Sequence, residues 1–116
     1  MRLIDQKTDE GCFQACLASL LGAELGDIPE FSNESWATEI TDWLLAEHGL
    51  QTLFITVFND WLPYNWFLKI GKSPRGECCH AVISRRYGLD HDPHPSREGL
   101  ETVEYYVVFI PLASLS

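Results

Sequence analysis

The chain is organised around the stretch Asp9-Glu10-Gly11-Cys12-Phe13-Gln14-Ala15-Cys16-Leu17-Ala18-Ser19-Leu20-Leu21-Gly22. Its apolar residues recur at positions 13, 16, 17, 20 and 21, which is the spacing of a helix with one buried face. Asp9 and Gly11 favour a turn before this helix, and Gly22 is a typical residue for its C-terminal end. The sequence therefore predicts a mostly buried helix over residues 12–21, with Cys12 in its first turn.

The position of Cys12 at the start of a predicted helix favours a reactive sulfur. The first turn of a helix leaves backbone N–H groups without partners, and it lies at the positive end of the helix dipole. Both effects favour a thiolate, which is the form of cysteine that attacks carbonyl groups. Free cysteines are also often no more than small buried hydrophobic residues, so Cys12 alone does not establish catalysis.

The composition predicts a single domain over residues 1–116. A chain of 116 residues can bury a core without metal ions or disulfides. Hydrophobic residues make up 46% of the chain, and no apolar run is long enough to cross a membrane. Asp and Glu number 17 against 8 Lys and Arg, and the resulting net charge of −9 argues against a nucleic-acid partner.

The cysteines and the first residues predict a cytoplasmic protein. The start, Met1-Arg2-Leu3-Ile4-Asp5, has no apolar segment of the kind found in signal peptides. Cys12 and Cys16 lie one helical turn apart, while Cys78 and Cys79 are adjacent. Neither arrangement is typical of a secreted disulfide framework, so we expect a reducing compartment.

The rest of the chain predicts an α+β fold. A second helix is expected over about 35–48, with Gly49 at its end. After Gly49 the residues become β-branched and aromatic, and five strands are predicted: 51–58, 67–70, 80–86, 88–92 and 103–110. Because the helices precede consecutive strands, we expect N-terminal helices packed against one face of a largely antiparallel sheet.

A cysteine nucleophile needs a base for its proton and a group that orients the base. His80 is the candidate base, since it opens a strand directly after a polar, turn-rich loop and should lie at a sheet edge that reaches a cleft. Asp92 is the candidate orienting group. Asp90 and His94 are the rival residues for this part of the site.

The hairpin register decides whether His80 and Asp92 can meet. A hairpin centred on Arg86 puts Asp92 directly opposite His80, and one centred on Tyr87 puts it one pair along on the same face. A hairpin centred between two residues would place the two side chains on opposite faces of the sheet. The prediction of a His80–Asp92 contact is therefore conditional on the register.

Gln6, six residues before Cys12, completes the candidate site. Its side-chain amide could donate to the oxygen that becomes negative as the thiolate attacks a carbonyl. The backbone N–H of Cys12 would be the second donor. A single Gln near the start of a chain means little, but Gln6, Cys12, His80 and Asp92 in this order mean more.

This ordered set resembles the papain-like cysteine peptidases, and most of all the bacteriocin-processing peptidases attached to ABC exporters. That family has a Gln, five residues, a Cys that opens a helix, a second Cys four residues on, then Leu-Ala. A His that starts a strand and an Asp-Pro pair follow. The matching residues here are Gln6, Cys12, Cys16, Leu17-Ala18, His80-Ala81-Val82-Ile83 and Asp92-Pro93. The chain also resembles small uncharacterised bacterial and phage proteins that carry a Cys-Phe-x-Ala-Cys-Leu-Ala-Ser-Leu segment and a His-Asp-Pro-His-Pro segment.

The resemblance implies a papain-like fold and a thiol hydrolase that cleaves a peptide, isopeptide or related amide bond through an acyl-enzyme. It implies Cys12 as nucleophile, His80 as base, Asp92 as orienting group and Gln6 in the oxyanion hole. Cys16 would be structural. The implied partner is a peptide or protein substrate, and no cofactor is implied. The sequence gives no oligomeric state.

The match departs from the exporter peptidases on both sides of the nucleophile. Those peptidases usually have Gly after the Cys, where this chain has Phe13, and an acidic residue before it, where this chain has Gly11. The segment Glu10-Gly11-Cys12-Phe13 is instead close to the Asp-Gly-x-Cys-Leu/Phe signature of the ovarian-tumour-type deubiquitinases. The departures concern the substrate rather than the Cys–His chemistry.

Two other interpretations compete with an enzyme. The first is a non-catalytic binding module with the papain-like fold. The second is a metal-binding protein, because a short segment holds soft and imidazole ligands. Adjacent cysteines on a strand point to opposite faces, and the chain has no Cys-x-x-Cys pair, so this segment suits a chelate poorly. Its candidate ligands are Cys78, Cys79, His80, His91 and His94.

Overall fold

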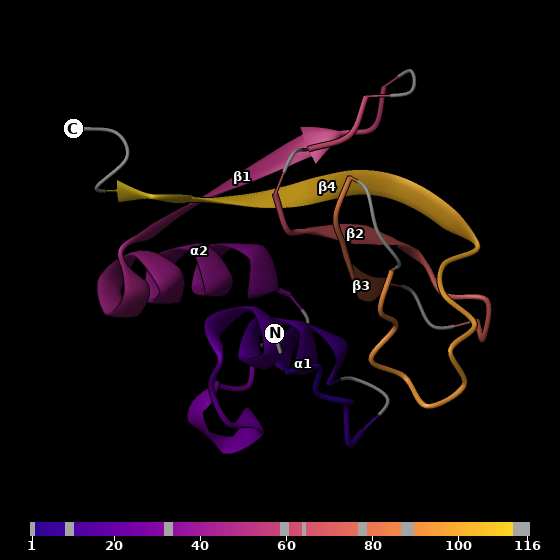
Figure 1. Ribbon diagram of the computed structural model, residues 1–116, viewed down its shortest axis with the longest axis horizontal. Helices are drawn as coiled ribbons and strands as arrows, with labels where there is room; N and C mark the ends of the chain where they lie inside the picture. The colour runs from indigo at the N-terminus through magenta and orange to yellow at the C-terminus, as the bar shows by residue number, and fades with distance from the viewer. Residues whose placement is uncertain are drawn as a thin grey trace.

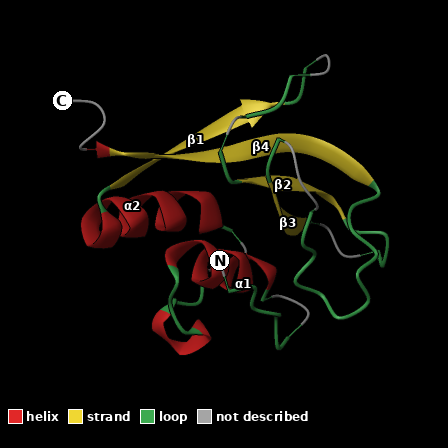
Figure 2. Ribbon diagram, in the orientation of Figure 1, coloured by secondary structure: helices red, strands yellow, loops and turns green. Residues whose placement is uncertain are grey.

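Two helices lie on one face of a four-stranded antiparallel sheet in the computed structural model (Figures 1 and 2). The structure describes residues 2–8, 11–31, 34–58, 61–63, 65–76, 79–86 and 90–112. The elements are α1 (Cys12–Leu21), a 3₁₀ turn (Leu25–Asp27), α2 (Trp36–His48), β1 (Leu50–Thr56), β2 (Phe67–Lys72), β3 (His80–Ser84) and β4 (Thr102–Pro111). The order of the strands in the sheet is β1-β4-β2-β3. The α+β prediction is confirmed.

Both predicted helices are present and end where glycine permits. Gly22 and Gly49 follow α1 and α2 in the left-handed conformation, with φ of 67° and 62°. Their backbone N–H groups bond to carbonyls of the last helical turn, which closes each helix. At the start of α2, Ser35 Oγ donates to Glu39 Oε2 at 2.6 Å. The helix begins at Trp36, one residue after the predicted start, and Ser35 is the capping residue before it.

Four of the five predicted strands are found, with ends shifted by a few residues. The predicted strand 88–92 is wrong in the part that the structure describes: of residues 90–92, only His91 pairs, in an isolated bridge with Ile83. The two residues exchange backbone hydrogen bonds of 2.9 and 2.8 Å. Residues 87–89, where the turn was predicted, lie outside the described residues.

Side chains explain why this segment leaves the sheet. Asp90 binds Ser84 Oγ and pairs with Lys69 Nζ at 2.9 Å, which holds it against the strand through side chains rather than through the backbone. One residue after the bridge, Asp92 accepts the backbone N–H of His94 in a local turn, and Pro93 has no N–H for a ladder. The pairing of Ile83 with His91 is the register centred on residue 87.

The hydrophobic core fills the space between the helices and the sheet. One cluster joins the α1 cysteines to β2, β3 and β4, and its buried members are Cys12, Cys16, Leu68, Ile70, Ala81, Ile83 and Val107. A second cluster joins the two helices through Leu17, Ala18, Ile28, Ile40 and Leu44. No helix in the described part of the chain is long and apolar enough to cross a membrane. The first cluster is the one that places the candidate site.

Candidate active site

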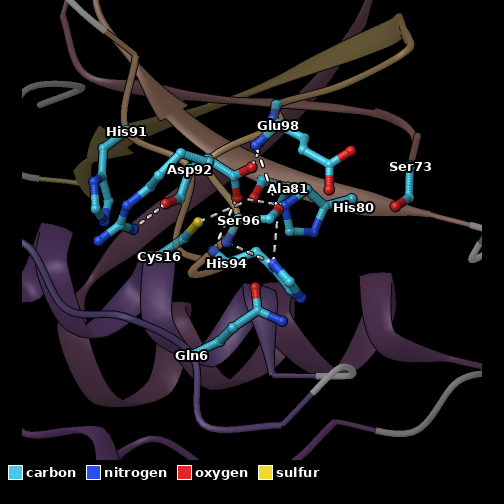
Figure 3. A network of polar contacts seen from close by, with 12 residues as sticks. Gln6, Cys16, Ser73, His80, Ala81, His91, Asp92, His94, Ser96 and Glu98 are labelled. Atoms are coloured by element: carbon cyan, nitrogen blue, oxygen red, sulfur yellow. Dashed lines mark hydrogen bonds and ion pairs between the residues drawn. The ribbon is translucent and has the colours of Figure 1, made fainter. Parts of the chain in front are cut away.

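His80 and Asp92 form a buried pair at the first residue of β3 (Figure 3). The His80 Nε2 atom lies 2.7 Å from Asp92 Oδ1, and the two residues are only 1% and 7% exposed. The register centred on residue 87 puts Asp92 one pair along from His80 on the same face, and their side chains meet there. The predicted contact between His80 and Asp92 is confirmed.

Asp92 is held as a charged acceptor. Its Oδ1 also accepts the backbone N–H of His94 at 2.9 Å, and its Oδ2 accepts the backbone N–H of Gly99 at 2.7 Å. Burial by itself raises the pKa of Asp92, but these hydrogen bonds and the one with His80 outweigh burial and bring the pKa below its usual value. Since Asp92 is a carboxylate, the shared proton lies on His80 Nε2.

The two rival residues have other partners. Asp90 binds Ser84 and Lys69 on the far side of the His91 bridge. The His94 ring lies edge-on to the His80 ring, with centroids 6.4 Å apart, and its Nδ1 contacts Ser96 Oγ at 2.9 Å. Asp92 is therefore the partner of the His80 ring.

Cys12 begins α1 and points into the core cluster, where it is 4% exposed. Its sulfur lies beside the backbone of Ala81, the residue that follows His80 on β3. Among the described residues no hydrogen bond joins the Cys12 thiol to His80, and the closeness of these two side chains stays a prediction. Since the contact with Asp92 uses His80 Nε2, any contact of this ring with a thiol has to use Nδ1.

The predicted thiolate at Cys12 is wrong for the resting protein. Burial raises the pKa of the Cys12 thiol to about 12. Hydrogen bonding from the Ala81 backbone and from the first N–H groups of α1 acts in the opposite direction, as the helix argument requires, but desolvation is larger. The thiol is therefore neutral near pH 7.

Cys16 lies one turn further along α1 and is fully buried. Its Sγ donates to the backbone oxygen of Ala81 at 3.7 Å, and burial raises its pKa well above the usual value. The two cysteines therefore flank the same residue of β3. These contacts agree with the structural role implied for Cys16.

Gln6 packs against the turn that precedes Cys12. It is 5% exposed, and its Nε2 donates to the Thr8 oxygen at 2.8 Å, which also accepts the Gly11 N–H at 3.1 Å. A Cβ atom at Gly11 would lie 3.6 Å from the Cβ of Gln6 and 3.1 Å from Thr8 Oγ1. The contact with Thr8 would be tight and the contact with Gln6 ordinary, so glycine at position 11 mainly makes room for the Thr8 side chain. Figure 3 shows the Gln6 carboxamide pointing towards the His94 ring.

The sequence argument missed residues that place His80 and Asp92. Gly71 pairs with His80 at a β-bulge of β2, and a Cβ there would lie 1.8 Å from the Thr102 oxygen. Its signal is a glycine directly after the predicted strand 67–70, because a glycine in a strand pattern often marks a bulge or a close approach of another backbone. Gly99 supplies a backbone donor to Asp92, and Arg97 a side-chain donor to its carbonyl, and neither carried a signal.

The four candidate metal ligands that the structure describes do not form a chelate with one another. Within these residues no group of three or more His, Cys, Asp or Glu side chains is suited to hold a metal ion. Cys78 lies outside the described residues. His80 is bound to Asp92, while His91 Nε2 lies 3.5 Å from Asp5 Oδ1.

Comparisons of the chain with family models, with curated proteins and with solved structures found no match. The family resemblance of the sequence therefore stays a prediction.

Proposed function

We propose that this protein is a thiol hydrolase with a papain-like fold, which cleaves a peptide, isopeptide or related amide bond. The observation that carries the proposal is the buried His80–Asp92 pair, at 2.7 Å, one residue along β3 from the backbone that contacts the Cys12 thiol. Burying a carboxylate and an imidazole costs desolvation energy, so such a pair is weak evidence for stability. It is the arrangement that orients an imidazole and stabilises its charged form during acyl transfer.

In the proposed reaction, Cys12 starts as a neutral thiol. As its sulfur attacks the substrate carbonyl, its proton passes to His80 Nδ1, and Asp92 stabilises the imidazolium through Nε2. The carbonyl oxygen becomes negative, and the Cys12 backbone N–H and the Gln6 amide donate to it.

The second half of the proposed reaction returns the enzyme. The imidazolium gives its proton to the leaving amine, and the carbon–nitrogen bond breaks to leave a thioester on Cys12. A water molecule then attacks this thioester while His80 takes its proton, and the acid product leaves with the thiol restored.

The other parts of the proposal follow from the same chemistry. The substrate is an extended peptide or a protein segment, because the resemblance is to peptidases. A reducing compartment such as the cytoplasm suits an enzyme that needs Cys12 as a thiol, and Cys12 and Cys16 are free thiols four residues apart.

A non-catalytic module of the same fold is the second candidate, and one observation favours it. Cys12 is 4% exposed and its thiol pKa is raised to about 12, as expected for a structural cysteine. In that case the His80–Asp92 pair would only fix the loop after β3.

A panel of fluorogenic peptide amides, isopeptide-linked peptides and ubiquitin-like amides tests the proposal. The wild type and Cys16→Ala should turn over at least one member, and Cys12→Ala should turn over none. Cys16 is the matched control because it contacts the same Ala81 from the next turn of α1. Activity that survives Cys12→Ala but not Cys16→Ala, in folded proteins, would overturn the assignment of the nucleophile.

A further inference from the structure

The segment before Cys12 is tied to the loop after Asp92 by an ion pair. Arg97 reaches Asp5 with both terminal nitrogens, at 2.6 Å from Nη1 to Oδ1 and 2.8 Å from Nη2 to Oδ2. One residue along, the Gln6 backbone N–H donates to the Pro93 oxygen at 2.9 Å. The first residues of the chain and a loop about ninety residues later are thereby held side by side.

The same guanidinium also holds the residue that carries the buried carboxylate. Arg97 Nη1 donates to the backbone oxygen of Asp92 at 2.5 Å. Arg97 has a φ of 56°, a left-handed conformation that few residues other than Gly, Asn and Asp adopt. This conformation folds the loop back towards Asp92, and Gly99 then donates to the Asp92 carboxylate.

We infer that Asp5 and Arg97 are positioning residues, which set Asp92 against His80 and Gln6 against Cys12 as one unit. One guanidinium binds both the Asp92 carbonyl and the carboxylate next to Gln6. The orienting group and the proposed oxyanion donor therefore share one connection, in addition to their own local hydrogen bonds. The consequence for catalysis rests on the proposed function, whereas the effect on the His80–Asp92 bond does not.

The exposure of the Arg97 and Asp5 side chains distinguishes a positioning role from a role in the stability of the fold. The side chains of Arg97 and Asp5 are 48% and 44% exposed, and ion pairs this open to water contribute little to stability. Loss of the pair should therefore leave the melting temperature nearly unchanged. It should instead loosen the loop that holds the Asp92 carboxylate against the His80 ring.

The matched control is another ion pair of the same N-terminal segment. Arg2 Nη2 lies 2.9 Å from Glu24 Oε1, with side chains 62% and 72% exposed, and in the described part of the chain this pair has no hydrogen bond to His80, Asp92 or Arg97. Arg2→Gln therefore removes an exposed arginine ion pair without touching the Asp92 loop. Asp5→Asn is a second test variant, because it weakens the same ion pair but keeps the Arg97 side chain.

The experiment is ¹⁵N-edited NMR of the full chain, without substrate, at one fixed pH. It measures how fast the His80 Nε2 proton exchanges with water, together with the melting temperature. We expect exchange about tenfold faster in Arg97→Gln, a smaller increase in Arg97→Lys and Asp5→Asn, and none in Arg2→Gln, with melting temperatures within about 3 °C of the wild type. If the panel identifies a substrate, Arg97→Gln should lower kcat rather than raise KM.

Equal exchange rates in Arg97→Gln, Asp5→Asn and Arg2→Gln would overturn the inference. The result is distinguishable from a failure of the proposed function. Faster exchange in an inactive protein would support the positioning role and reject only its catalytic consequence. An active enzyme with unchanged exchange would reject the positioning role and keep the nucleophile.

Discussion

The two halves of the candidate site are both buried, yet they are ionised differently. Asp92 is 7% exposed and accepts hydrogen bonds from the His80 ring and from the backbones of His94 and Gly99. Cys12 is 4% exposed and lies in an apolar cluster, with the Ala81 backbone as its polar neighbour. The pKa of Asp92 is lowered and that of Cys12 is raised to about 12.

This difference shows that burial alone does not determine whether a side chain is charged. Desolvation opposes ionisation of both side chains, but only Asp92 has enough donors to overcome it. Under the proposed function, the orienting carboxylate is therefore already charged before substrate arrives, whereas the proposed nucleophile is still a neutral thiol. In the proposed reaction, the negative charge on Cys12 is created as the substrate carbonyl approaches, when His80 takes the proton and the oxyanion donors begin to act.

The largest expected effect concerns the alkylation of Cys12 by iodoacetamide. A thiol with a pKa of about 12 has a thiolate fraction near neutral pH about 10³-fold below that of an ordinary cysteine with a pKa near 8.5. The alkylation rate of Cys12, which peptide mass spectrometry measures separately from that of the other cysteines, should therefore rise about tenfold per pH unit from pH 6 to 10, without a plateau. Cys16, which is fully buried, should react more slowly still. If the alkylation rate of Cys12 instead levels off with a midpoint near pH 7, Cys12 is a thiolate in the resting protein. Cys12 and Asp92 would then both be charged, and the difference between the two halves of the site would not exist.

The next effect concerns the oxyanion donor. Gln6→Ala should lower kcat by about 10²–10³ with little change in KM, as the loss of one donor to the transition state does. Gln14→Ala is the matched control, since Gln14 Nε2 binds the oxygens of Ile28 and Pro29, at 2.9 and 3.1 Å, outside the site. Steady-state kinetics on a substrate from the panel measures both variants. Equal losses of kcat in Gln6→Ala and Gln14→Ala would mean that Gln6 is not an oxyanion donor.

The smallest effect concerns the stability that Asp92 contributes. Its folded pKa lies below the unfolded value of 3.8, so its contribution is complete above that value and is lost as pH falls through the folded pKa. Asp92→Asn should lower the free energy of unfolding by about 1–3 kcal/mol at pH 7, because donors to the carboxylate lose a charged partner. The difference from the wild type should shrink below about pH 4.

Urea denaturation between pH 3 and pH 7 measures this dependence. Asp90→Asn is the control, because Asp90 pairs with Lys69 at a position where the Asp90 side chain is 45% exposed. Its loss should cost no more than about 1 kcal/mol. A difference between wild type and Asp92→Asn that stays constant down to pH 3 would contradict the charged state assigned to Asp92.

The sequence predicted those parts of the fold that depend on local signals. Both helices end at glycines, Gly22 and Gly49, whose left-handed conformation closes them. The His80–Asp92 contact was predictable on one condition, because hairpins centred on residue 86 or 87 put the two side chains on one face, whereas a hairpin centred between two residues does not. The structure has the register centred on residue 87.

The rest depends on contacts between segments far apart in the chain. The strand predicted over 88–92 fails because side chains of Asp90 and Asp92 bind β2, β3 and their own loop instead of extending the ladder. The thiolate at Cys12 fails because β3 covers the sulfur, a desolvation that helix position cannot reveal. Gly71 is needed because of Thr102 on β4, about thirty residues later.

Trapping of the acyl-enzyme directly tests whether Cys12 and His80 act together in catalysis. The protein is mixed with activated peptide esters, quenched in acid within seconds and digested, and the acylated residue is located by mass spectrometry. We predict a thioester on Cys12 in the wild type and in Cys16→Ala. It should form more slowly by about 10²–10⁴ in His80→Ala, which lacks the proposed general base. An acyl group on a different cysteine, or a rate on Cys12 that does not depend on His80, would contradict the claim that these two residues act together.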